Sequence, residues 1–363
     1  MTVPSADHQV LFRPVDLEPI GSDRTIVGVF NPAATRFNDG IVLLLRVDES
    51  PSTAGSDTVA LPRIESLGGQ PRWVIDTLAR EGIDTSDPRE FRLSDGSMRL
   101  PHLSHFRVVR LSSDGTTVQS VSVVRDLLPR EPWEELGIED PRITRIGDTY
   151  YVTYVAISRH MGIVTALMTT SDFQSFTRHG IIFATENKDV VIVPGMLDGG
   201  FVAYHRPVSC SGVGRPSIVS SRSPDGVHWG QHRLLLGPRP GMWDCVKVGA
   251  GPPPIRVPDG WLLIYHGVDT ASSADPVGTY RAGAALIDAE DPGRVLARSH
   301  EPMLEPRHPH EITGFVPNVI FPTGLVSDGA DYVLLFGGAA DEVSTVTRLS
   351  VRSVLDHLKV TET

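Results

Sequence analysis

The chain has 363 residues, of which 40% are hydrophobic, and a formal net charge of −11 at pH 7. It has no basic run that would neutralise a phosphate backbone and no apolar stretch near the roughly 18 residues of a membrane span, so we expect neither nucleic acid nor a membrane as a partner. Residues 1–9 lack the basic start and apolar core of a secretory signal, which favours a cytoplasmic location. Cys210 and Cys245 are too few for a disulfide framework, and we expect ordinary thiols.

Short apolar runs recur along the chain, each after a proline near a polar or glycine turn. The prolines are Pro32, Pro141, Pro194, Pro254 and Pro317, and the runs cover residues 43–46, 150–154, 201–206, 261–266 and 332–336. The last three intervals between prolines are about 50–60 residues, close to one four-stranded propeller blade, whereas the first is about twice as long and must hold an insertion. The sequence therefore predicts an all-β fold, a five-bladed β-propeller forming a single catalytic domain over residues 1–363.

Turn signals separate the predicted strands. Asp-Gly pairs at 39–40, 114–115, 198–199, 225–226, 259–260 and 328–329, and Gly-Asp at 147–148, are typical of hairpins, so residues 142–146 should pair with 150–154. Helical periodicity is confined to residues 69–81 and 352–359. We therefore predict a helix inside an insertion at about 60–100 and a short C-terminal helix.

Polar residues stand at or near the repeated runs. In a propeller the innermost strands and their loops surround a central channel, so polar residues at equivalent points of different blades converge there. The residues in question are Arg46, Asp140, Arg142, Lys188, Asp189, His205, Arg206, Lys247, His266 and Asp341. Several cations with few carboxylates suit an anionic ligand.

Several blocks together resemble glycoside hydrolase family 130, the β-mannoside phosphorylases. They are Gly137–Thr144 with Tyr150–Tyr154, then Tyr204–Pro207, Lys247–Pro253, Ile264–Val268, Tyr280–Ala284 and Ala339–Asp341. The family is known as five-bladed propellers that cleave β-mannosides by inverting phosphorolysis to α-mannose 1-phosphate. The resemblance implies a β-1,2- or β-1,4-linked mannosyl disaccharide or oligosaccharide as substrate, inorganic phosphate as co-substrate and no cofactor; it leaves open whether the chain forms a homo-oligomer.

The resemblance also implies roles for individual residues. Asp140 matches the general acid, and the phosphate-binding positions match Lys188, Arg206, Lys247 and His266. The substrate-binding positions match Asn31, Arg46, Glu139, Arg142, Asp189, His205, Tyr280 and Asp341. Residues 271–280 and the insertion at 60–100 match the loops that set acceptor specificity.

The proposed chemistry is sound on first principles. A glycosidic oxygen leaves poorly unless it is protonated, and an aspartic acid in an enclosed site can hold its proton near neutral pH. An ordinary inverting hydrolase needs a second carboxylate to activate water. Phosphate is already a nucleophile and needs a cradle of cations instead, which the basic set supplies.

Other interpretations stay open. The chain could be a β-mannoside hydrolase of the same fold, or a non-catalytic carbohydrate-binding propeller in which Asp140 is only a turn residue accepting backbone hydrogen bonds. Residues 308–310 read His-Pro-His, but no third ligand with sensible spacing follows, so we predict no metal site.

Overall fold

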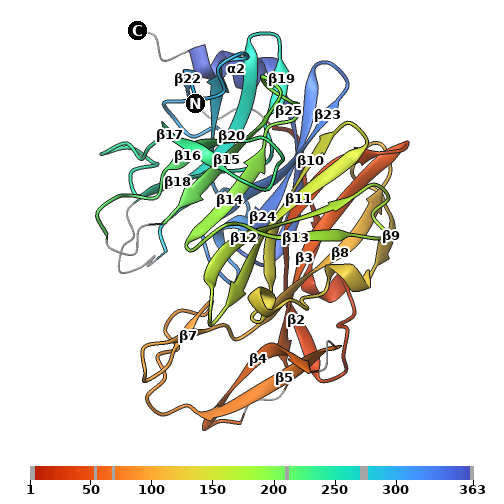
Figure 1. The fold of residues 1–363 in the computed structure, drawn as a ribbon, viewed down its shortest axis with the longest axis vertical. Coiled ribbons are helices and arrows are strands. Elements are labelled where there is room, and N and C mark those ends of the chain that lie inside the picture. Colours follow the sequence, from red (N-terminus) through yellow and green to blue (C-terminus); the bar gives the residue numbers. More distant parts are fainter. Residues whose placement is uncertain (1–4, 53–54, 68–69, 209–211, 270–276, 360–363) are drawn as a thin grey trace.

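The computed structural model describes residues 5–52, 55–67, 70–208, 212–269 and 277–359. Within these ranges the strands form the five blades of a β-propeller, as the sequence predicts (Figure 1). Cys210 and most of the loop at 271–280 lie outside the described residues.

Three blades follow one another from the N-terminal side, and each is an antiparallel sheet. In order from the channel outward, their strands are β2 (Arg24–Phe37), β3 (Gly40–Pro51), β8 (Leu103–Leu111) and β9 (Val118–Ser122); then β10 (Ile138–Ile146), β11 (Thr149–Ser158), β12 (Gly162–Thr170) and β13 (Thr177–Phe183); then β14 (Asn187–Ile192), β15 (Phe201–Pro207), β16 (Ile218–Ser223) and β17 (Gly230–Leu236).

The last two blades complete the ring. The fourth contains β18 (Lys247–Ala250), β20 (Gly260–Val268), β21 (Tyr280–Ile287) and β22 (Val295–Arg298), with β19 (Ile255–Val257) also paired to β20. The fifth contains β23 (Ile320–Asp328), β24 (Tyr332–Ala339), β25 (Val343–Ser350) and β1 (Ser5–Phe12). The N-terminal strand is therefore the outermost strand of the blade that the C-terminal part of the chain builds.

The repeated apolar runs are the second strands of the blades, β3, β11, β15, β20 and β24. In β3, Leu43 and Leu45 pack with β24 of the fifth blade, whereas Leu44 between them packs with β11 of the second blade. Side chains alternate between the two faces of a strand, and both faces of a blade are covered by neighbouring blades. This explains why these strands are continuously apolar.

The insertion between β3 and β8 contains strands where the sequence predicted a helix. Its hairpin, β4 (Thr58–Leu67) and β5 (Gln70–Ala79), extends away from the blades at one end of the molecule (Figure 1), and β6 (Phe91–Arg92) pairs with β7 (Met98–Arg99). The helix prediction for residues 69–81 is wrong, because β-branched Val74, Ile75 and Thr77 favour an extended chain and Arg63 Nε of β4 donates to Asp76 Oδ2 across the hairpin at 2.9 Å.

Helices in the described residues are short. Helix α2 (Val351–Lys359) follows β25 near the predicted position and packs on the outer strands of the fourth and fifth blades, while α1 (Pro309–Ile312) precedes β23. Single 3₁₀ turns are η1 (Pro14–Asp16), η2 (Arg125–Leu127) and η3 (Pro132–Glu134).

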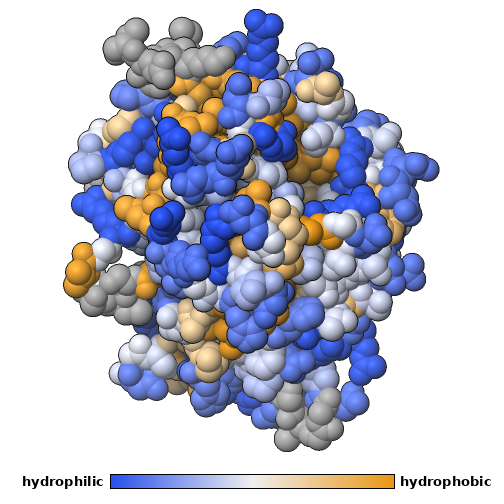
Figure 2. Space-filling view, turned by 45° about the horizontal axis from the view of Figure 1, so that its top comes forward, coloured by the Kyte–Doolittle hydropathy of each residue, from blue (hydrophilic) through white to orange (hydrophobic). Residues whose placement is uncertain are grey.

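Hydrophilic side chains dominate the face shown in Figure 2, with apolar side chains between them in several separate groups. Among the described residues, none of the helices has the length and apolar character needed to cross a bilayer.

Candidate functional site

The inner strands of three successive blades share a local irregularity. The pairing register breaks between Phe30 and Ala33 in β2, between Glu139 and Arg142 in β10, and between Lys188 and Val191 in β14. In each case the first residue of the unpaired pair has a positive φ: 48° at Asn31, 47° at Asp140 and 54° at Asp189. Asn and Asp tolerate this conformation better than most residues, and such bulges redirect side chains. A bulge with a positive φ therefore turns a polar side chain toward the channel in each of these three strands.

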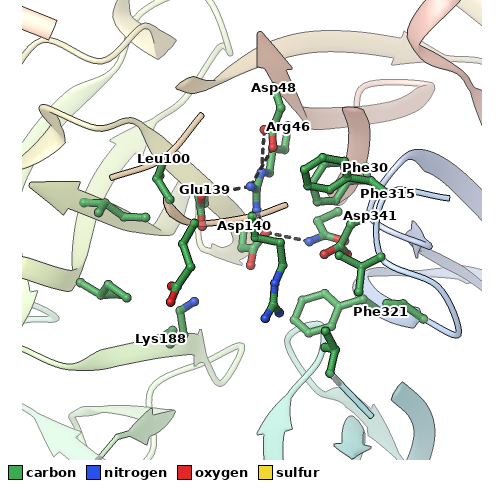
Figure 3. A pocket seen from close by; sticks show the side chains of 18 of the residues that line it. Phe30, Arg46, Asp48, Leu100, Glu139, Asp140, Lys188, Phe315, Phe321 and Asp341 are labelled. Atoms are coloured by element: carbon green, nitrogen blue, oxygen red, sulfur yellow. Dashed lines mark hydrogen bonds and ion pairs between the residues drawn. The ribbon is translucent and has the colours of Figure 1, made fainter. Parts of the chain in front are cut away.

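These side chains meet in one pocket at the centre of the ring (Figure 3). All the residues that the sequence predicted for the site, except Arg142, His205 and His266, line it: Asn31, Arg46, Glu139, Asp140, Lys188, Asp189, Arg206, Lys247, Tyr280 and Asp341. They come from all five blades, which explains why residues separated by hundreds of positions act at one place.

Arg46 holds Asp140 in position. Its Nη1 donates to Asp140 Oδ1 at 2.9 Å, while its other nitrogens donate to Asp48 Oδ1 at 2.8 Å and Glu139 Oε1 at 3.0 Å. Asn31 Nδ2 adds a hydrogen bond of 2.7 Å to the same Asp140 oxygen. Both donors engage Oδ1, so the second oxygen of Asp140 is left to face a ligand.

Asp140 is ionised in the ligand-free protein. Burial alone would raise the pKa of this carboxyl, but the charges of Arg46, Arg142 and Lys188 outweigh burial and hold its pKa below the usual value. The sequence suggested that enclosure would keep the proton on Asp140, whereas in the structure the surrounding cations reverse that effect. A ligand that neutralises those cations would raise the pKa again.

Positive charge is concentrated on the neighbouring part of the wall. Lys188, Arg206 and Lys247 line the pocket together, and Arg206 Nε lies 2.6 Å from Asp189 Oδ2. Burial and the nearby Arg206 and Lys188 lower the pKa of Lys247 to about 7. Besides burial, repulsion from these neighbouring cations opposes protonation of Lys247, although carboxylates such as Asp189 also line the pocket. An anion would relieve that repulsion.

Asp341 faces the cavity across from Lys188 (Figure 3). Burial raises its pKa to about 6, and the charge of Asp140 adds to the effect, against the opposing attraction of Arg46. Asp140 and Asp341 therefore differ: Asp140 is ionised at neutral pH, whereas the pKa of Asp341 lies about one unit below neutral pH.

Arg142 and His205 lie outside the pocket lining. Arg142 is buried behind the bulge, where its Nε donates to Gly251 O at 2.6 Å and its Nη1 to Asp140 O at 3.0 Å, so it fixes the backbone of Asp140. His205 stacks on Phe183 with ring centroids 4.4 Å apart, and burial lowers its pKa to about 3. Their substrate-binding roles stay predictions.

His266 lies behind the lining, fully buried, with its Nε2 3.5 Å from Asp189 Oδ2. Burial lowers its pKa to about 3, so the ring is neutral at neutral pH. Neither ring nitrogen has a hydrogen-bond partner among the described residues. A phosphate role for His266 stays a prediction, and the neutral ring would serve there as a hydrogen-bond donor rather than as a cation.

The structure adds residues that the sequence did not single out. The insertion contributes Arg89, Glu90, Met98 and Leu100 to the pocket wall, in the segment expected to set acceptor specificity. Besides Tyr280, three aromatic side chains come from residues outside the quoted blocks: Phe30, Phe315 and Phe321. These residues belong to no repeated pattern, so only their position in the fold identifies them.

Comparisons of sequence support the same grouping. Residues 109–360 match the family model of glycoside hydrolase family 130, described as beta-1,4-mannooligosaccharide phosphorylase. The chain is 36% identical to the beta-1,2-mannobiose phosphorylase of Listeria innocua serovar 6a over 99% of both chains. It is 35% identical to a 1,2-beta-oligomannan phosphorylase of Thermoanaerobacter sp., over 67% of this chain and 78% of that protein.

Solved structures resemble the whole chain. The beta-1,2-mannobiose phosphorylase from Listeria innocua, in complex with beta-1,2-mannobiose, superposes with a TM-score of 0.88 at 37% identity, covering 96% of this chain and 97% of that one. A mannose phosphorylase from Leishmania mexicana in complex with phosphate has a TM-score of 0.56 at 14% identity, covering 91% and 86%, and shares the fold.

Proposed function

We propose that this chain, which belongs to glycoside hydrolase family 130, the β-mannoside phosphorylases, cleaves β-1,2-linked mannobiose with inorganic phosphate. The products would be α-mannose 1-phosphate and mannose. The β-1,2 linkage is supported by the likeness to the Listeria innocua enzyme over nearly the full length of both chains.

The observation that carries the proposal is the group of three cations, Lys188, Arg206 and Lys247, that lines the pocket together with Asp140. Phosphate carries between one and two negative charges near neutral pH, and each charge-assisted hydrogen bond in a sheltered site contributes roughly 1.5–3 kcal/mol. A neutral water molecule would gain much less from these cations than a phosphate anion does. The cluster therefore favours phosphorolysis over hydrolysis.

Phosphate would also prepare the acid. By neutralising Lys188 and its neighbours, the bound anion removes part of the field that keeps Asp140 ionised, so the carboxyl can take up a proton. Asp140 then delivers that proton to the glycosidic oxygen while phosphate attacks the anomeric carbon from the opposite face. Attack from that face inverts the β-mannoside to α-mannose 1-phosphate.

The direct test is an assay of the purified chain with β-1,2-mannobiose, with and without phosphate. We expect mannose 1-phosphate only when phosphate is present, and slower turnover of β-1,4-mannobiose. Phosphate-independent release of free mannose would establish hydrolysis instead. Binding of the disaccharide without any turnover would leave a carbohydrate-binding module.

Asp140→Asn tests the acid. Asn tolerates the positive φ at this position, so the fold should persist, and the loss of proton donation should lower kcat by about 10²- to 10⁴-fold. Circular dichroism and disaccharide binding check that the variant is intact. A variant that keeps most of the wild-type rate on mannobiose removes Asp140 from this role.

Arg206→Ala tests the anion site. We expect the KM for phosphate to rise about tenfold to a hundredfold, with a much smaller change in the KM for mannobiose, because one charged contact to phosphate is lost. Arg233→Ala, at an exposed position on the outer strand β17 of the same blade, is the matched control. Equal phosphate KM values in the two variants contradict the assignment.

A further inference from the structure

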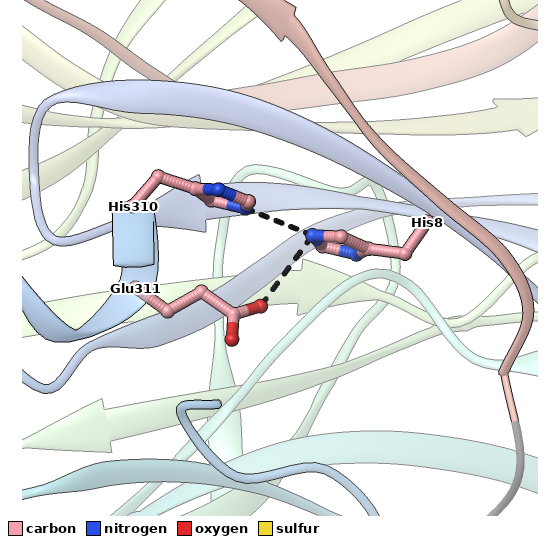
Figure 4. A group of neighbouring side chains, drawn as sticks. All are labelled: His8, His310 and Glu311. Atoms are coloured by element: carbon pink, nitrogen blue, oxygen red, sulfur yellow. Dashed lines mark hydrogen bonds and ion pairs between the residues drawn. The ribbon is translucent and has the colours of Figure 1, made fainter. Parts of the chain in front are cut away.

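A second group of polar side chains lies between the N-terminal strand and the segment that precedes β23 (Figure 4). His8 of β1 meets His310 and Glu311 of α1, and their nearest ligand atoms lie within 4.8 Å of one another. His8 and Glu311 line a cavity of about 300 Å³ that is separate from the pocket around Asp140. The sequence singled out only His308 and His310, because His8 is about 300 positions away from them.

The spacing of the three ligand atoms suits a metal ion. His8 Nε2 lies 2.9 Å from His310 Nε2 and 3.6 Å from Glu311 Oε1. Ligand atoms around a tetrahedral zinc ion lie about 3.4 Å apart, because each is about 2.1 Å from the metal. The His8–His310 hydrogen bond would therefore open by about half an ångström to admit an ion. His310 and Glu311, whose ligand atoms lie within 4.8 Å of each other, would adjust to the same spacing.

The surroundings orient two of these groups in advance. His8 Nδ1 lies 2.8 Å from Thr347 Oγ1, and donation of its proton there leaves the lone pair of Nε2 facing the other two residues. Glu311 Oε2 accepts hydrogen bonds from the backbone N–H groups of Arg307 and His308, each at 2.8 Å, so Oε1 remains to face His8. Ligating side chains in metal sites are held by second partners of this kind.

The ring of His308 also holds His8 in its orientation. It lies nearly parallel to that of His8, with an interplanar angle of 5° and centroids 4.4 Å apart, which restricts rotation of the His8 ring.

We propose that His8, His310 and Glu311 form a binding site for a divalent transition-metal ion, with Zn²⁺ as the ion that fits best. Two imidazoles and one carboxylate make a donor set that zinc accepts, with water in the fourth position. Mg²⁺ and Ca²⁺ prefer all-oxygen ligands and would bind poorly to two imidazoles.

The location gives the site a structural consequence. β1 is the outer strand of the fifth blade, and α1 belongs to the connection whose Phe315 and Val316 line the pocket around Asp140. An ion bound to both would tie the N-terminal strand to that connection. It would add a second link at the point where the ring closes.

Isothermal titration and metal analysis test this proposal. The full chain is treated with EDTA, freed of chelator, and titrated with ZnCl₂ in a phosphate-free buffer at pH 7.5, so that neither substrate nor catalysis enters the result. We expect about one Zn²⁺ retained per chain after gel filtration, no measurable binding of Mg²⁺, and a Tm that rises by a few degrees with zinc.

Variants separate this site from adventitious surface binding. His310→Gln should weaken zinc binding by at least about 100-fold, and Thr347→Val, which removes only the partner of His8, by about tenfold. His300→Gln is the matched control, because His300 is exposed, lies 3.0 Å from Glu301 and belongs neither to the three proposed ligands nor to the cavity beside them. Unchanged phosphorolysis in zinc-free buffer shows that each variant is folded. The proposal is overturned if the wild type retains no zinc, or if the double variant His8→Gln/His310→Gln retains as much as His300→Gln.

Discussion

Asp341 links the charge of the pocket to the stability of the fold. Burial, with the added charge of Asp140, raises its pKa to about 6, whereas an aspartate in an unfolded chain titrates near 3.9. A carboxyl with a raised folded-state pKa stabilises the protein fully only below about pH 4, and that contribution is lost as the pH rises through about 6. The folded protein therefore becomes less stable across this window because Asp341 must ionise while buried.

Asp341→Asn removes that ionisation. The free energy of unfolding is measured for both proteins by urea denaturation in phosphate-free buffer at pH 4.5 and pH 8. We expect the difference, variant minus wild type, to be about 1–3 kcal/mol larger at pH 8 than at pH 4.5. Asp259→Asn, in an exposed turn, is the control and should show no such pH dependence. A difference between Asp341→Asn and wild type that stays constant with pH would mean that Asp341 is not the titrating group.

Pocket residues could be predicted from the sequence where an Asn or Asp precedes a proline at the start of a β-bulge. Asn31-Pro32 and Asp140-Pro141 stand at the start of the bulges, and their side chains reach the pocket as predicted. The charge state of Asp140 could not be predicted from its enclosure, because it depends on how close Arg46 and Lys188 come in the folded chain. His8 was missed for a related reason: no local pattern connects it to residues at the other end of the chain.

At the scale of the elements, two strand glycines differ in the space around them. Gly249 of β18 faces Asp189 and His266 so closely that a Cβ atom there would overlap with both side chains. Gly230, at the start of the outer strand β17, has no heavy atom within 4 Å of the position that a Cβ would take. The absence of a side chain at 249 is therefore a requirement of the anion site.

Gly249→Ala should displace Asp189, and with it Arg206, whose Nε lies 2.6 Å from that carboxylate. We expect a loss of about 1–3 kcal/mol in the free energy of unfolding, from overpacking, and a raised KM for phosphate. Gly230→Ala should change the free energy by less than about 0.5 kcal/mol and leave the KM unchanged. The two variants are compared by denaturation and by phosphate-dependent kinetics; equal behaviour would contradict this account of β18.

The strands were easier to predict than the insertion. Asp-Gly turns and continuously apolar runs specify blade strands because the neighbouring blades cover both faces. In the insertion, residues 58–79 contain no Asp-Gly pair that would mark a turn. The spacing of Trp73, Ile75 and Leu78 there is typical of a helix instead. The strand β5 depends on its partner β4 and on contacts such as Arg24, whose guanidinium lies 3.9 Å from the centre of the Trp73 ring. Such partners override a weak periodic signal.

At the scale of the whole molecule, the ring is closed by pairing between the two ends of the chain. β1 pairs with β25, and Phe12 at its end is 4% exposed and packs in the core shared by the fifth and first blades. Since a propeller blade is stable only when its neighbours cover it, detachment of β1 would expose the edge of β25 and loosen this junction. The closing strand should therefore contribute to global stability rather than only to the order of the N-terminus.

Phe12→Ala tests the closure. Deleting a buried aromatic side chain typically costs about 3–5 kcal/mol, so we expect a lower Tm and a lower denaturation midpoint, with fluorescence and phosphorolysis lost in the same transition. Val15→Ala, three residues further on and 87% exposed, should leave both unchanged. If Phe12→Ala kept the wild-type midpoint, β1 would not contribute to closure, and the ring would be held together by the other contacts between blades. If activity were lost well before the fluorescence change, β1 would support the pocket locally rather than the whole propeller.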